Sequence, residues 1–208
     1  MADKHIITIA RQYGSGGREI GKKLAEALGY RFYDRALLTR AAEEYGISHS
    51  KLEKADERPG DRYLYFNPIT SEGLLSEDFL RDPNHISTDD IAQAQFCTIR
   101  KIAEEPESAI IIGRCGDRVL RDMPEKLSIY IYADLEDRVR RIMDRVKVNE
   151  REAKRLIKRT DKLRASYYNY FTDAVWGDIE NYDLCLNAGR LGIEGAVQVI
   201  RSYLQQTS

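Results

Sequence analysis

Apolar residues fall in two alternating arrangements along this chain: short continuous runs, and longer stretches with a helical period. Continuous runs occupy residues 6–10, 109–113 and 127–133, and their composition predicts strands that are buried in a sheet. Two shorter segments, "RFYD" at 31–34 and "YDLCLNA" at 182–188, predict two further strands. Strands that alternate with helices are typical of a mostly parallel sheet covered by helices on both faces.

The helical stretches repeat their apolar positions every three or four residues and stop at recognisable signals. Ile20, Leu24 and Leu28 follow this period and Gly29 comes next, which predicts a helix over residues 18–28. Further helices are expected at 36–45, at 88–104, from 135 to about 170 with a break and a cap near Asn149, and at 193–204. Together these elements predict a single α/β domain over residues 1–208.

A glycine-rich segment, "YGSGGRE", joins the first predicted strand to the first predicted helix. Glycines at such a junction let successive backbone N–H groups face one anion, and the helix N-terminus adds its partial positive charge. The alternative is a tight turn that binds nothing. The candidate phosphate-binding residues are Gly14, Ser15, Gly16, Gly17, Arg18 and Glu19. Set against "GPSGSGKST", the segment aligns without a gap, but Gly17 stands where lysine belongs.

Two charged residues after the glycines offer replacements for the missing motif groups. Arg18 could hold phosphate oxygens bidentately in place of the lysine. Glu19 could replace the hydroxyl that normally reaches Mg²⁺, because carboxylates are ordinary ligands of that ion. Glu19 could equally be an acidic residue that the helix dipole favours in a first turn.

Composition and charge exclude several classes of function. Lys and Arg number 33 and Asp and Glu number 34 among 208 residues, so bulk charge gives no reason to expect a nucleic-acid partner. The three cysteines form no C-x-x-C pair, which fits a reducing compartment, and cytoplasmic localisation is expected. No apolar run is long enough for a membrane span or a secretion signal, so no membrane partner is expected.

Segments spread over the chain also match motifs of a known enzyme family. "ITIARQYGSGGREIGKKLAEALGYRFYD" stands where the family has its loop, first helix and second strand. "FYDRALLTR" is similar to "FLDSGALYR", which matches Asp34 and Arg40. "IIGRCGDRVL" is similar to "VIDGRDIGTVVL", which matches Arg114. "RTDKLRASYYNYFT" is similar to the lid pattern "RDxxDxxR". The sequence thus resembles nucleoside monophosphate kinases of the cytidylate kinase type, specifically the divergent cytidylate kinase-like branch.

The resemblance implies a P-loop fold that uses Mg²⁺ and transfers the γ-phosphoryl group of ATP to a nucleoside monophosphate, CMP-like, or to a related small acceptor. The fold would be a three-layer P-loop NTPase fold with five parallel strands, a helical acceptor-binding insert at about 35–97 and a lid at about 145–172. Arg18, Arg159, Arg164 and Asp161 would be catalytic, with the last three in the lid. Asp34, Arg40 and Arg114 would bind the acceptor.

Departures from the family pattern bear on the acceptor and on activity. Ile112 and Cys115 replace two carboxylates that in the family help to read cytosine, so a weaker preference for cytosine is expected. The missing lysine favours a different class, a nucleotide-binding regulatory protein without kinase turnover. The arginines retained in both the acceptor segment and the lid favour the enzyme.

Overall fold

The structure is a computed structural model that describes residues 4–34 and 88–207. Five described strands form one parallel sheet in the order β2-β3-β1-β4-β5. The strands are β1 (Ile6–Arg11), β2 (Arg31–Tyr33), β3 (Ala109–Ile112), β4 (Lys126–Tyr132) and β5 (Leu184–Asn187). The central strand β1 pairs with β3 through Ile6 opposite Ala109, and with β4 through Ile6 opposite Lys126.

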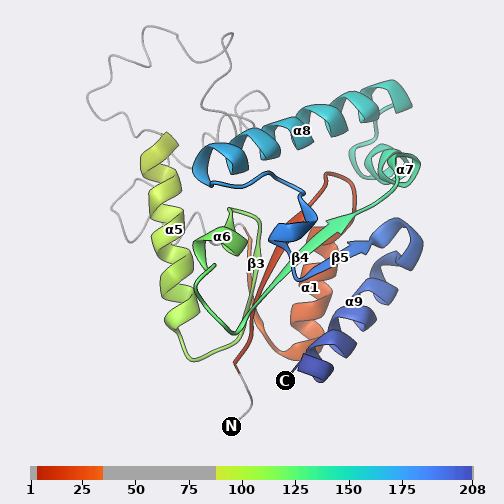
Figure 1. The fold of residues 1–208 in the computed structure, drawn as a ribbon. Coiled ribbons are helices and arrows are strands. Elements are labelled where there is room, and N and C mark those ends of the chain that lie inside the picture. Colours follow the sequence, from red (N-terminus) through yellow and green to blue (C-terminus); the bar gives the residue numbers. More distant parts are fainter. Residues whose placement is uncertain (1–3, 35–87, 208) are drawn as a thin grey trace, which may run out of the picture.

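Helices cover both faces of this sheet, as Figure 1 shows. The helical elements are α1 (Gly17–Leu28), α5 (Thr88–Glu104), α6 (Gly116–Val119), α7 (Leu135–Val146), α8 (Glu150–Phe171), the short 3₁₀ helix η2 (Ile179–Asn181) and α9 (Ala188–Thr207). One face is packed by α1 and α9, where Ile20, Leu24 and Ile200 are fully buried against strand residues. The other face is packed by α5 and α6, with Ile99 and Leu120 in the interface.

The three-layer arrangement confirms the fold class predicted from the pattern. All five predicted strands are present, within two residues of their expected ends, and β3 is buried along its whole length. The short elements α6 and η2 were not predicted, because neither is long enough to show a period. The predicted helix at 36–45, Arg40 and most of the predicted insert at 35–97 lie outside the described residues.

Helices α7 and α8 pack on each other and lie beside the carboxyl ends of the strands (Figure 1). The predicted break between them is present: the Asn149 side chain accepts a hydrogen bond from the Glu152 amide at 3.0 Å and caps α8. The other end of α8 packs on α5, where Tyr167 and Tyr168 are buried with Phe96. Helix α8 therefore bridges α7 and α5 across the edge of the sheet at which β1 ends.

Candidate nucleotide-binding site

The predicted phosphate loop lies between the end of β1 and the start of α1. Gly16 is the N-cap of α1 with φ of 89°, a left-handed conformation that favours glycine, and no side chain caps the first turn. Gly14 also has a positive φ, of 82°. The first N–H groups of the helix are therefore not capped by a side chain, and such uncapped groups at a helix N-terminus can bind an anion.

Local contacts fix the shape of this loop. The Ser15 hydroxyl donates to the Gln12 carbonyl at 2.9 Å, so the serine holds the turn together from a buried position. The Gln12 amide donates to the Ile131 carbonyl at 3.0 Å, and its side-chain oxygen accepts from the Ala133 amide at 3.2 Å. These bonds tie the loop to β4 and to the residue that follows it.

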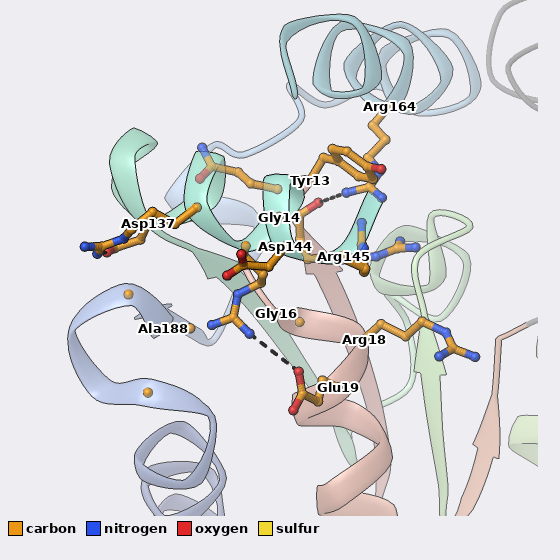
Figure 2. Close-up of a pocket in the computed structure, with 17 residues that line it drawn as sticks. Tyr13, Gly14, Gly16, Arg18, Glu19, Asp137, Asp144, Arg145, Arg164 and Ala188 are labelled. Atoms are coloured by element: carbon orange, nitrogen blue, oxygen red, sulfur yellow. Dashed lines mark hydrogen bonds and ion pairs between the residues drawn. The ribbon is translucent and has the colours of Figure 1, made fainter. Parts of the chain in front are cut away.

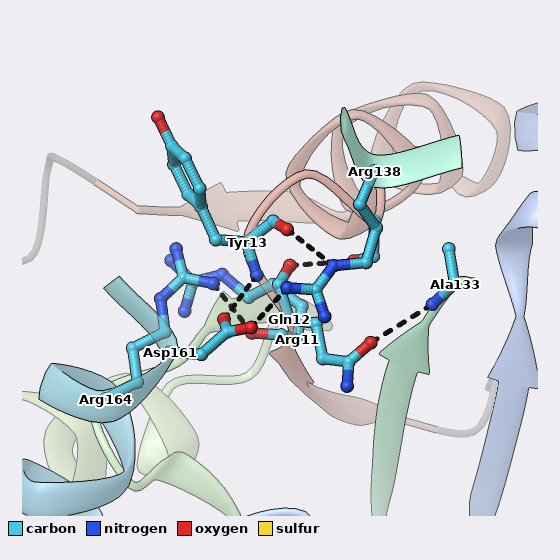
Figure 3. A network of polar contacts seen from close by, with 8 residues as sticks. Arg11, Gln12, Tyr13, Ala133, Arg138, Asp161 and Arg164 are labelled. Atoms are coloured by element: carbon cyan, nitrogen blue, oxygen red, sulfur yellow. Dashed lines mark hydrogen bonds and ion pairs between the residues drawn. The ribbon is translucent and has the colours of Figure 1, made fainter. Parts of the chain in front are cut away.

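Side chains from α7 and α8 hold the loop backbone from the other side (Figure 3). Arg138 of α7 donates from Nε to the Tyr13 carbonyl at 3.0 Å and also pairs with Asp161 of α8. Asp161 in turn accepts a hydrogen bond from the Tyr13 backbone amide at 2.7 Å. Arg164 of α8 donates to the Arg11 carbonyl at 2.7 Å. Helix α7 is thus bonded to Tyr13, and α8 to Tyr13 and Arg11, at the start of the loop.

The loop forms one wall of a cavity of about 770 Å³ (Figure 2). Its other walls come from α7, from Arg164 of α8 and from the start of α9. Six arginines line it, against three acidic residues: Arg11, Arg18, Arg140, Arg141, Arg145 and Arg164, with Glu19, Asp137 and Asp144. A surplus of guanidinium groups around a helix N-terminus suits a ligand with several phosphates.

Arg18 lines the cavity but already has an anionic partner. Its Nε donates to Asp34 Oδ2 at 2.6 Å, and its side chain is 61% exposed. Figure 2 shows it directed away from Asp144 and Ala188. Two predicted site residues, one from the loop and one from the end of β2, are therefore brought together as an ion pair. Glu19, the candidate metal ligand, also lines the cavity and lies 3.5 Å from an Arg141 nitrogen.

The three predicted lid residues differ in their surroundings. Asp161 is bonded to the loop and to Arg138, and burial raises its pKa although both contacts favour the carboxylate. Arg164 lines the cavity, and burial lowers its pKa to about 10, so it remains a cation at neutral pH. Arg159 is exposed on α8 and is not among the residues that line the cavity.

The segment after β3 carries Arg114 in an unusual backbone conformation. Gly113, Arg114 and Cys115 all have positive φ, of 70°, 58° and 55°. Non-glycine residues rarely adopt this conformation, and such strain concentrates at functional sites. Cys115 and Ile112, which replace the two acids of the family motif, are buried, and burial raises the pKa of the Cys115 thiol.

A carboxylate near this turn points into the protein rather than into the cavity. Asp117 is buried and accepts a hydrogen bond from the Tyr168 hydroxyl at 2.5 Å. Burial raises the pKa of Asp117, with the Tyr168 hydrogen bond acting in the opposite direction. Asp34, by contrast, lies next to a residue of the cavity wall, Arg18.

Arg11, a residue that the sequence interpretation did not select, is the least expected member of the site. It is half-buried at the last position of β1, and its pKa is lowered to about 9, first by burial and then by Arg164. A signal was available in the sequence: a cation ends an otherwise apolar strand, at the first position of a loop that lacks its lysine.

Two kinds of feature are absent from the described residues. Over 4–34 and 88–207, no group of three or more His, Cys, Asp or Glu side chains is arranged to hold a metal ion. Within the same ranges, no helix has both the length and the apolar character that a membrane crossing requires.

Comparisons with known proteins place this geometry in context. A cytidylate kinase from Saccharolobus islandicus is 26% identical over 204 residues, which cover 98% of this chain and 92% of the relative. A cytidylate kinase from Haloarcula marismortui is 25% identical over 195 residues, covering 93% of this chain and 86% of the relative.

Solved structures agree on the fold. An uncharacterized protein from Eubacterium ventriosum superposes with a TM-score of 0.70 at 30% identity, covering 97% of this chain and 99% of that one. A shikimate kinase from Bacteroides thetaiotaomicron shares the fold, with a TM-score of 0.55 at 15% identity and coverage of 97% and 98%. The model of the cytidylate kinase-like family matches residues 6–190. This match spans most of the sequence, and the protein belongs to the cytidylate kinase-like family.

Proposed function

We propose that this protein transfers the terminal phosphoryl group of ATP to a nucleoside monophosphate. The observation that carries the proposal is the uncapped, glycine-rich start of α1, which opens into a cavity lined by six arginines. Such a site suits the polyphosphate of a nucleotide. Family membership and relatives that are cytidylate kinases add support for phosphoryl transfer and for a CMP-like acceptor.

The reaction places few covalent demands on the protein. An acceptor phosphate oxygen forms a bond to the γ-phosphorus, and the bond from that phosphorus to the bridging oxygen breaks. The electron pair stays on the bridging oxygen, which leaves as part of ADP. Positioning and positive charge then provide most of the rate enhancement. Arg18 and Arg164 line the cavity and would contribute such charge.

Mg²⁺ is implied by the family, and the chemistry of the cavity fits it. Glu19, Asp137 and Asp144 are carboxylates on the cavity wall, and carboxylates with phosphate oxygens are the usual ligands of this ion. When bound, Mg²⁺ supplies positive charge to the phosphates. Glu19, in the first turn of α1, is the carboxylate that we propose for it.

The acceptor would bind on the side of the loop where Arg18 meets Asp34. Asp34 directly follows β2 and Arg114 lies two residues after β3, so the carboxyl ends of neighbouring strands present both residues. Because buried Ile112 and Cys115 stand in for the family's two acids, we expect weaker discrimination for cytosine over other bases. Arg40 and Arg159 retain their proposed roles in acceptor binding and in the lid.

Turnover with a panel of acceptors tests this function. Purified protein with ATP and Mg²⁺ is assayed for ADP formation with CMP, UMP, AMP and GMP, against a blank that contains ATP alone. ADP production above the blank supports the kinase. ATP binding without ADP production by any acceptor would favour the regulatory alternative, which the missing lysine suggests.

A further inference from the structure

The phosphate loop departs from the common nucleotide-binding motif at two positions that are neighbours in space. The motif G-x-x-x-x-G-K has glycine first and lysine seventh, and the lysine reaches the β- and γ-phosphates. In this chain the first position is Arg11 and the seventh is Gly17. The glycine and the cation have exchanged places along the loop.

The structure shows why the seventh position carries no side chain. A Cβ on Gly17 would lie 2.7 Å from the Cβ and 3.1 Å from the Cγ of Arg11, and 3.2 Å from the Cβ of Ile131. Gly17 has no positive φ, so space and not backbone conformation requires glycine here. The contacts are with the base of the Arg11 side chain, which cannot swing aside as a chain end would. Arg11 occupies the space in which a lysine at position 17 would begin.

The far end of the Arg11 side chain lies against a second glycine. A Cβ on Gly113 would lie 2.1 Å from Arg11 Nη1 and 3.3 Å from its Cζ. Gly113 directly follows β3, which pairs with β1. The side chain therefore runs from the end of β1, past the first residue of α1, to the turn that carries Arg114. This path leads from the phosphate loop toward the proposed acceptor side.

The guanidinium of Arg11 lies in positive surroundings. Arg164, Arg114 and Arg18 each lower its pKa, and Asp34 is the acid that raises it. The Asp34 carboxylate is already bonded to Arg18 at 2.6 Å. Among the described residues, no oxygen accepts a hydrogen bond from the Arg11 side chain. A half-buried cation beside other cations is costly unless an anion joins it.

We propose that Arg11 supplies the cation that lysine supplies in the common motif, and that it binds the terminal phosphate of the nucleoside triphosphate. This inference rests on the proposed function and identifies the residue that holds the transferred group. Arg11 reaches the phosphate from the strand side of the loop, whereas a motif lysine reaches it from the helix side. Its planar fork can bond two phosphate oxygens at once.

Arg11 is better suited to this task than Arg18, which sequence alignment alone puts forward. The Arg18 side chain is 61% exposed and bonded to Asp34, while Arg11 is half-buried with donors that no described oxygen accepts. Removing Arg18 should therefore reduce phosphoryl transfer less than removing Arg11.

Binding of a non-hydrolysable ATP analogue and of ADP to the full chain tests the inference, together with turnover. Arg11→Met keeps the aliphatic stem against Gly17 and removes the charge. We expect its affinity for the ATP analogue to fall about tenfold or more and its ADP affinity to stay within about threefold. Phosphoryl transfer should fall about 100-fold or more, the scale on which single preorganised donors act.

The melting temperature separates a role of Arg11 in ligand binding from a role in packing. Because Arg11 lies among like charges, Arg11→Met without nucleotide should melt at the wild-type temperature or higher. Arg201→Ala, an exposed position on α9, is the matched control and should leave both affinities and turnover unchanged. If Arg11→Met does not fold, Arg11→Gln takes its place under the same criteria.

The possible failures are distinguishable. A wild-type protein that neither binds the ATP analogue nor forms ADP would contradict the proposed function and this inference with it. A wild-type protein that is active, with a folded Arg11→Met variant within about threefold of it in analogue affinity and turnover, would overturn only the role of Arg11.

Discussion

Two arginines at the phosphate loop, Arg138 and Arg11, differ in their partners. Arg138 is 6% exposed and donates to both Asp161 and the Tyr13 carbonyl, so its charge is satisfied within the protein. Arg11 is half-buried, faces other arginines and has no described oxygen as acceptor. A satisfied buried charge belongs to the architecture, whereas an unsatisfied one at a cavity is a candidate for ligand binding.

The largest expected effect concerns the satisfied arginine. Arg138→Met leaves Asp161 largely buried without its cation, and breaking such a pair costs about 3 kcal/mol of unfolding free energy. Urea denaturation of the full chain measures this loss. In Arg138→Met/Asp161→Asn, part of the loss should be recovered, because no unpaired carboxylate remains. If Arg138→Met were as stable as wild type, the pair of Arg138 with Asp161 would not stabilise the fold, and Arg138 would not differ from Arg11 in this respect.

A smaller effect is expected from filling the space over Gly17. Gly17→Ala puts a Cβ 2.7 Å from the Arg11 Cβ, and overpacking of this kind costs about 2 kcal/mol. The same substitution in an Arg11→Gly background should cost much less, because the crowded atoms are gone. Denaturation of the four proteins of this double-mutant cycle measures the coupling. If Gly17→Ala lowered the unfolding free energy equally in both backgrounds, the Arg11 side chain would not be the reason that position 17 is glycine.

The acceptor side should respond separately from the triphosphate side. Arg114→Ala should raise the Michaelis constant for the acceptor about tenfold and leave the affinity for an ATP analogue nearly unchanged. Steady-state kinetics and calorimetry provide the two readouts. If Arg114→Ala lowered only the affinity for the ATP analogue, Arg114 would bind the triphosphate, as proposed for Arg11, and not the acceptor.

The smallest effect compares two helix starts. Asn149 caps α8 with its own side chain, so Asn149→Ala should lower the unfolding free energy by about 1 kcal/mol. The start of α1 has no side-chain cap, so phosphate-containing ligands should protect its amides from hydrogen exchange and leave those of α8 unaffected. Equal protection at both helix starts would argue against a dedicated phosphate site at α1.

Much of the fold follows from local sequence signals. The strands β1, β3 and β4 are continuous apolar runs, and the break at Asn149 carries its own capping residue. Elements of this kind are predictable because their signals lie within a few neighbouring residues. The short α6 escaped prediction because four residues cannot show a helical period.

The site was less predictable than the fold, for a physical reason. The glycine loop is recognisable from its spacing, and the order of residues alone puts Arg18 forward as the replacement cation. Its pairing with Asp34 and the passage of Arg11 between Gly17 and Gly113 depend on how distant segments meet. Such contacts follow from tertiary packing, which a single sequence does not display.

A structure of the protein with a bound non-hydrolysable ATP analogue would show which groups hold each phosphate. We expect the β-phosphate to lie within hydrogen-bonding distance of the Gly16 and Gly17 amides and the terminal phosphate to contact the Arg11 guanidinium. A nucleotide bound in this loop with Arg11 turned away from every phosphate oxygen, and another cation in its place, would contradict this expectation.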